Sequence, residues 1–138
     1  MNQTLLDATP IVAICDDKQI DSHRLCVEIY KSISGSFVTT LPCLTEAMYL
    51  LYRERGWQGQ SKLWELLAQE NIEIQDFIDV ELSHMKELME KYNDTPMDFA
   101  DASLVVAAES LGIKRIFTLD SDFYVYRIND TESFEVIP

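Results

Sequence analysis

Residues 94–122, DTPMDFADASLVVAAESLGIKRIFTLDSD, predict a helix, then a strand, then an acidic loop. We expect Thr95 to cap the helix, because a proline next to it and the acid Asp98 three residues later are typical of a helix start. Gly112 would end the helix in a left-handed conformation. Residues 115–119 are mostly apolar and bounded by polar residues, which is typical of a short buried strand.

Carboxylates stand at both ends of this helix–strand unit. Asp98 and Asp101 are three residues apart, so both lie on one helical face near the start of the helix. Asp120 and Asp122 follow the strand directly. Because a fold can bring the end of a strand next to the start of a helix, the pattern predicts a cation site in outline.

The remaining sequence predicts strands that alternate with helices. Such alternation is typical of βα units, so we predict a three-layer α/β/α sandwich with a mainly parallel central sheet. Ligands of such sheets bind beyond the carboxyl ends of the strands, and Asp7 follows the first strand. We expect strands at 3–6, 37–40, 72–74 and 134–137, and helices at 11–14, 22–34, 42–55, 63–67 and 82–92.

The composition indicates a globular protein with no bulk attraction for nucleic acid. The 138 residues suit a single domain, 1–138, and 24 acids against 11 bases give a net charge of −13. A polyanion would therefore need a local site or bound cations. The three cysteines lack metal-ligand spacing, and the sequence shows neither a signal peptide nor a membrane span, so we expect free buried thiols, a cytoplasmic location and no membrane contact.

Ordered motifs across nearly the whole chain resemble the PIN domain family. The sequence LLDATP, which contains Asp7, resembles the family's opening. Glu46 stands where the family has its second acid, early in a helix after the second strand. The acid–alanine pair that begins at Asp101 resembles the third position, and the ending TLDSDF, with Asp120, resembles the fourth. Length and element order suit in particular the bacterial toxins known as VapC.

The resemblance implies a metal-dependent ribonuclease that hydrolyses RNA with Mg²⁺ or Mn²⁺. It also implies a homodimer and a cognate antitoxin as the partner of a toxin. Both ions prefer oxygen ligands, and the sequence has no Cys/His cluster for zinc. By this resemblance we expect Asp7, Glu46 and Asp101 to be the principal metal ligands and Asp120 to complete the site. Asp98 and Asp122 would be outer acids or ligands of a second metal. The hydroxyl of Thr118 would orient a carboxylate or a bound water.

Simpler interpretations stay open for individual residues. Asp98 alone is equally well explained as a helix cap, and Asp122 is better explained as a turn acid or the N-cap of a short helix. Asp7 would suit a cap of the turn that follows it, and Glu46 alone would be a solvated helix acid. Only the match to the family's ordered positions favours ligation at Glu46.

Two other functions compete with the ribonuclease. Asp16 and Asp17 are similar to the paired acids of a receiver domain, but the middle of the chain lacks the phosphoacceptor acid that such a domain needs. A PIN-like module that binds RNA or protein without cutting is the second alternative, and the intact acids argue against it. Outside the motifs, we expect the bulky apolar residues in the core or at a partner surface; these are Trp57, Trp64, Met85 and Met89. We expect His23 and His84 at the surface.

Overall fold

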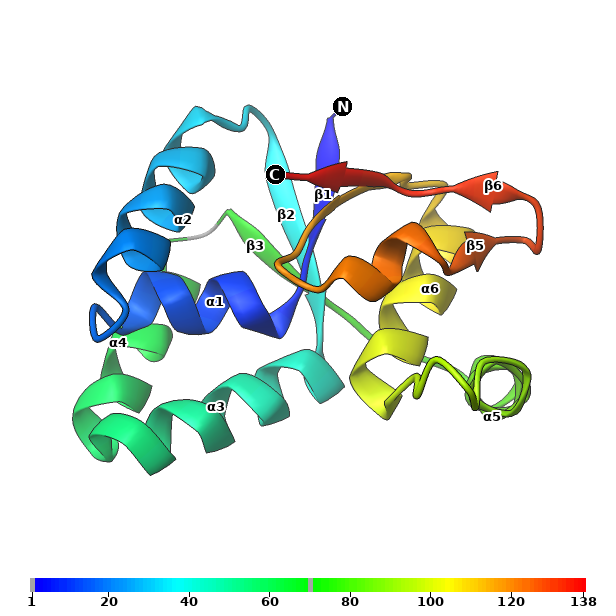
Figure 1. The fold of residues 1–138 in the computed structure, drawn as a ribbon, viewed down its shortest axis with the longest axis horizontal. Helices are drawn as coiled ribbons and strands as arrows, with labels where there is room; N and C mark the ends of the chain where they lie inside the picture. Colours follow the sequence, from blue (N-terminus) through cyan, green and yellow to red (C-terminus); the bar gives the residue numbers. More distant parts are fainter. Residues whose placement is uncertain (1, 70) are drawn as a thin grey trace.

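The computed structural model describes residues 2–69 and 71–138, and this part of the chain forms a five-stranded parallel sheet (Figure 1). The strand order is β3-β2-β1-β4-β7, so β1 is central. The strands are β1 (Gln3–Leu6), β2 (Ser36–Thr40), β3 (Ile72–Gln75), β4 (Arg115–Phe117) and β7 (Glu135–Ile137).

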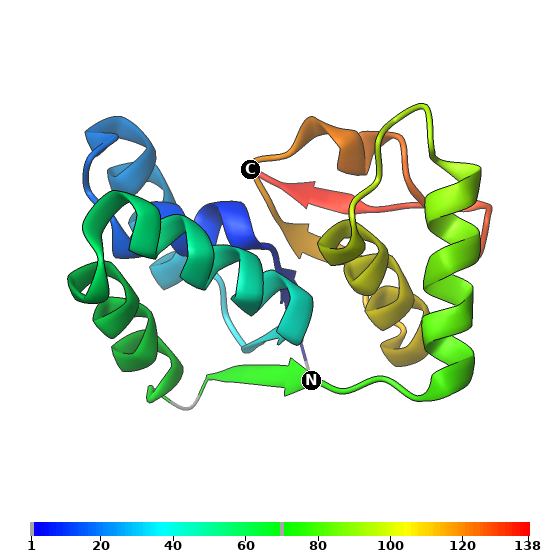
Figure 2. The ribbon, with the colours of Figure 1, turned by 90° about the horizontal axis from the view of Figure 1, so that it is seen from below.

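Helices cover both faces of this sheet. Helices α1 to α4 gather on one side of it and α5 and α6 on the other, as the two views agree (Figures 1 and 2). This arrangement confirms the predicted three-layer α/β/α sandwich. The helices are α1 (Ala8–Cys15), α2 (Ile20–Ser32), α3 (Leu41–Arg55), α4 (Trp57–Leu67), α5 (Asp79–Lys91) and α6 (Phe99–Leu111), and a short 3₁₀ helix, η1, spans Ser121–Tyr124.

The central strand β1 pairs with a neighbouring strand on each side. Leu5 lies opposite Val38 of β2 and opposite Ile116 of β4, and both pairings are parallel. All three side chains are buried, as expected for a strand covered on both faces. The strands that precede Asp7 and Asp120 are therefore adjacent and parallel, with β1 at the centre of the sheet.

Helix α6 begins three residues later than the sequence predicted. Its N-cap is Asp98 and not Thr95, and Asp101 occupies the capping-box position. Two capping boxes of the same spacing overlap here, and the Tyr92 carbonyl accepts a hydrogen bond from the Thr95 amide at 3.0 Å, which holds the earlier residues in a turn. Gly112 ends the helix in the left-handed region, with φ of 68°, as predicted.

A C-terminal hairpin that the sequence did not predict follows η1. Its strands, β5 (Arg127–Ile128) and β6 (Glu132–Ser133), have two residues each, too few for alternation to be visible. Asn129 and Asp130 have φ of 51° and 64°, which a tight hairpin turn requires. The hairpin packs beside α6, and the segment directly before it contributes to the candidate site described below.

The surface differs in part from the expectation. Met85 is fully buried and Met89 packs against the core, so the methionines add nothing to an exposed apolar face. Trp57 and Trp64 are 64% and 57% exposed on α4. The cysteines are free and buried, as expected. Within the described residues, no helix is both long and apolar enough to cross a membrane.

Candidate active site

Asp7 lies at the carboxyl end of the central strand and is almost fully buried. Its Oδ1 accepts a hydrogen bond from the Ala8 amide at 2.7 Å, so it also caps α1. Its Oδ2 accepts a hydrogen bond of 2.7 Å from the hydroxyl of Thr118, which follows β4. The Asp7 amide donates to the Phe117 carbonyl at 3.1 Å. Hydrogen bonds thus hold both the backbone and the carboxylate of Asp7. The Thr118 hydroxyl contacts this carboxylate directly, as its expected orienting role requires.

Thr118 also links Asp7 to the loop after β4. The Asp120 amide donates to the Thr118 hydroxyl at 3.0 Å, and Asp120 Oδ1 accepts from the Asp122 amide at 2.9 Å. The two acids that end strands β1 and β4 therefore lie at the same edge of the sheet. Asp122 stands in the first turn of η1, beyond Asp120.

The start of α6 brings two further acids to this edge. Asp98 Oδ1 accepts from the Asp101 amide at 2.7 Å, and Asp101 Oδ2 accepts from the Asp98 amide at 3.3 Å. Asp101 is 6% exposed, whereas Asp98 is exposed. The hydroxyl of Tyr126 donates to Asp101 Oδ2 at 3.1 Å. No sequence motif includes Tyr126, which lies directly before the hairpin that the sequence did not predict.

Glu46 approaches the same place from the second turn of α3. Thr40, at the end of β2, caps this helix by accepting from the Cys43 amide at 3.3 Å. The Thr40 hydroxyl also lies 2.7 Å from the hydroxyl of Ser103 on α6, and both groups are buried. This contact ties the starts of α3 and α6 together, which places half-buried Glu46 beside the α6 acids.

The charges of these carboxylates act on one another, which indicates that the groups lie close together. Burial, followed by repulsion from Asp120 and Asp98, raises the pKa of Asp7 to about 6. Burial and the charges of Asp98, Asp7 and Asp120 raise the pKa of Glu46 to about 7. Burial and repulsion from Asp98 and Asp7 raise the pKa of Asp101 to about 8. Acids that disfavour one another's ionisation in this way are typical of a site that a cation would stabilise.

The donor set suits magnesium or manganese, which take carboxylate and hydroxyl oxygens and retain waters. In the ranges 2–69 and 71–138, no three His, Cys, Asp or Glu side chains form a ready-made metal-ligand group. An ion held by these acids would therefore need waters to complete its ligands.

The six expected acids divide into an inner and an outer set. Asp98 contributes to the raised pKa of Asp7, Glu46 and Asp101, so it lies closer to the centre than an outer acid would. Asp122 is absent from the charges that act on those three groups. Burial and the charge of Asp120 raise its own pKa. We place Asp122 at the rim.

Other expected polar residues lie away from this edge. Asp16 caps the C-terminal end of α1 and pairs with Arg55 at 2.8 Å, while Asp17 lies 3.2 Å from the same guanidinium group. Neither acid ends a strand, which removes the basis of the receiver interpretation. His84 is partly exposed on α5, and its Nε2 lies 2.8 Å from Glu109 on α6.

A groove of about 860 Å³ opens beside the acids. Glu46 and Asp98 line it together with apolar groups that include Tyr49, Phe77 and Phe99. Phe99, the first residue of α6, is 48% exposed and lines this groove.

Comparisons with known proteins agree with this fold. A sequence model of the PIN domain matches residues 4–129. The crystal structure of Mycobacterium tuberculosis VapC20, described as a sarcin–ricin loop cleaving toxin, superposes with a TM-score of 0.81 at 15% identity and covers 90% of this chain and 94% of that one. VapBC2 from Rickettsia felis, bound to a promoter DNA fragment, gives a TM-score of 0.63 at 17% identity, covering 98% of each chain.

A toxin–antitoxin complex from Klebsiella pneumoniae gives a TM-score of 0.61 at 16% identity and covers 87% of this chain and 89% of that one. At these identities the likeness to solved structures concerns the fold. A search of curated protein sequences finds no match.

Proposed function

Since the chain belongs to the PIN domain family, we propose that it is a metal-dependent endoribonuclease and the toxin of a toxin–antitoxin pair. One observation carries the proposal: acids from four separate segments gather at the carboxyl edge of the sheet, where burial and the neighbouring charges raise the pKa of Asp7, Glu46 and Asp101. Such an edge is where open α/β sheets bind their ligands.

Asp7, Glu46, Asp101 and Asp120 would hold Mg²⁺ or Mn²⁺, with Asp98 next to them. When bound, the ion would activate a water and stabilise the charge on the phosphate during hydrolysis. The chain's own residues prepare this site. Thr118 and the Ala8 amide hold both oxygens of Asp7 in place.

A bound cation would also offset the negative charge of the protein near the RNA. A chain with a net charge of −13 repels RNA at long range, and none of the described residues that line the groove beside the acids is basic. Bound divalent ions would supply the positive charge where the phosphate must lie. We therefore expect metal to be needed for productive RNA binding as well as for cutting, with the protein acting in the cytoplasm.

The antitoxin would bind in the 860 Å³ groove. Two of the solved structures that share this fold contain toxin and antitoxin together. The groove combines apolar side chains with Glu46 and Asp98 at its wall, so it suits a peptide that carries apolar side chains and a basic residue. A peptide in this place would cover the candidate active site and inhibit the enzyme.

RNA cleavage with and without chelator tests the proposal. We expect the wild type to cut RNA with magnesium or manganese and to stop in excess chelator. Asp7→Asn should abolish cleavage, whereas Asp21→Asn, a matched change at an exposed acid on α2, should leave it intact. Cleavage that survives in chelator, or in Asp7→Asn, would refute the metal mechanism. Metal-dependent RNA binding without any cleavage would instead favour the non-catalytic binding module.

A further inference from the structure

We propose that Tyr126 is a positioning residue that fixes the Asp101 carboxylate for cation binding, an inference that rests on the proposed metal site. Tyr126 is fully buried, and its hydroxyl donates to Asp101 Oδ2 at 3.1 Å. It lies in the short segment between η1 and the C-terminal hairpin, directly before β5. This segment therefore contributes to the site through the hydrogen bond to Asp101.

The two oxygens of Asp101 have different surroundings. Oδ2 accepts hydrogen bonds from the Asp98 amide at 3.3 Å and from the Tyr126 hydroxyl at 3.1 Å. Within the described part of the chain, no hydrogen bond reaches Oδ1. With Oδ2 held by two donors, Oδ1 is the oxygen left to face a cation. Asp7 is held in a similar way by Thr118, so each of the two buried acids has its own hydroxyl donor.

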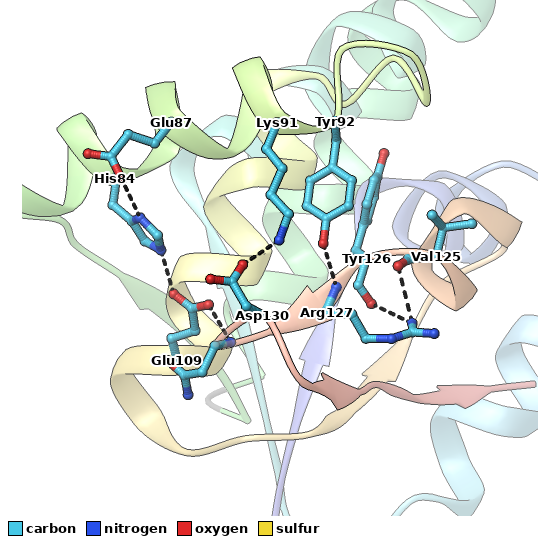
Figure 3. Close-up of polar contacts among 10 residues, drawn as sticks. His84, Glu87, Lys91, Tyr92, Glu109, Val125, Tyr126, Arg127 and Asp130 are labelled. Atoms are coloured by element: carbon cyan, nitrogen blue, oxygen red, sulfur yellow. Dashed lines mark hydrogen bonds and ion pairs between the residues drawn. The ribbon is translucent and has the colours of Figure 1, made fainter.

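The Tyr126 ring is held so that its hydroxyl cannot swing away. It packs edge-on against Tyr92 and against Phe123, with ring centroids 5.1 Å apart in both pairs. The next residue, Arg127, donates its amide to the Tyr92 hydroxyl at 3.1 Å (Figure 3). Tyr92 thus fixes both the ring and the backbone beside it.

Helices α5 and α6 also fasten the turn of the hairpin. The Asn129 amide donates to Glu109 Oε2 at 2.7 Å, and the other oxygen of Glu109 contacts His84 (Figure 3). Lys91 forms an ion pair with Asp130 across the same turn. These contacts hold the hairpin against α5 and α6. Among the hydrogen bonds of the described residues, only that of the Tyr126 hydroxyl joins this region to the site carboxylates.

The physical need for such a donor follows from the geometry of Asp101. Without the Tyr126 hydroxyl, only the Asp98 amide, at 3.3 Å, would hold Oδ2. Hydrogen bonds from outside the ligand shell hold a ligand in its binding orientation. Loss of the hydroxyl should therefore weaken cation binding but leave the reaction unchanged once metal saturates the site.

The test is a manganese titration of Tyr126→Phe without RNA, followed by electron paramagnetic resonance of free Mn²⁺. We expect binding to weaken by about tenfold. Tyr30→Phe is the matched control, because it removes a hydroxyl that donates to Asn71 at 2.8 Å in another part of the fold. The phenyl ring keeps its packing and Asp101 Oδ2 keeps the Asp98 amide, so the fold should persist.

A second arm uses the Asp101→Asn background, in which Tyr126→Phe should have no further effect on Mn²⁺ binding. In cleavage assays the metal concentration for half-maximal rate should rise, while the rate at saturating metal should match the wild type. Wild-type Mn²⁺ affinity in Tyr126→Phe, a loss equal to that of Tyr30→Phe, or a loss that persists in the Asn background would each overturn the proposal. If the wild type binds Mn²⁺ but cuts no RNA, the ribonuclease proposal fails while this one is still decided by the titration.

Discussion

Asp101→Asn should stabilise the metal-free protein, and the site gives the reason. The pKa of Asp101 is about 8 in the folded protein against an ordinary value of 3.8. Between about pH 4 and about pH 8 the folded chain therefore binds more protons at this residue than the unfolded chain. Stability must then fall as the pH rises through this window and level off above it.

The magnitude follows from the same values. One unit of pKa corresponds to about 1.4 kcal/mol, so the cost of Asp101 at pH 7 is at most about 4 kcal/mol. Neighbouring acids share their protons, and we expect roughly half of this cost to be removed by the neutral side chain. An asparagine whose oxygen occupies the position of Oδ2 can still accept from the Asp98 amide and the Tyr126 hydroxyl. A gain of about 2 kcal/mol corresponds to a rise of roughly 7 °C in Tm.

Thermal unfolding in chelator, across the window from about pH 4 to about pH 8, measures this effect. The wild type should lose stability with rising pH more steeply than Asp101→Asn, and the exposed change Asp21→Asn should behave as the wild type. Added Mn²⁺ should raise Tm of the wild type by mass action and raise that of Asp101→Asn much less. Equal pH slopes would show that Asp101 is not a repelled acid. An equal rise in Tm with metal would show that Asp101 is not a ligand.

Two further changes test the rest of the site and the surface. Thr118→Val removes the hydroxyl that holds Asp7 Oδ2 and should weaken Mn²⁺ binding by about tenfold in the same titration, so unchanged binding would contradict an orienting role for Thr118. Trp57 and Trp64 are seven residues apart on one face of α4 and mostly exposed, so we predict a homodimer through this face. Light scattering at tens of micromolar should give a dimer mass that Trp64→Ala lowers, and a monomer mass for the wild type would reject the dimer.

The fold was predictable because its signals are local and repeated. The strand before Asp7 and the strand before Asp120 are short apolar runs, and a parallel sheet places the carboxyl ends of both at one edge. That rule and the ordered acid motifs together indicated where Asp7, Glu46, Asp101 and Asp120 would meet. The structure brings them to that edge, and their role as ligands stays a prediction.

Other features depend on contacts that no local pattern encodes. Asp98 rather than Thr95 caps α6 because the turn at Tyr92 decides between two equal capping boxes. Tyr126 reaches Asp101 from the segment before a hairpin whose strands are too short to give an alternating pattern. The first feature is decided by a backbone turn and the second by tertiary packing, and periodicity along the sequence shows neither.

The hydrogen bond between Thr118 and Asp7 joins residues that are 111 positions apart. Ribosomes make proteins from the N-terminus, so a growing chain carries Asp7 long before its hydroxyl partner exists. Until then the first acid has no fixed orientation and strand β1 lacks β4 as its neighbour. A protein that cuts RNA would on this account stay harmless to its own messenger during most of its translation. Premature termination would yield fragments without a working site.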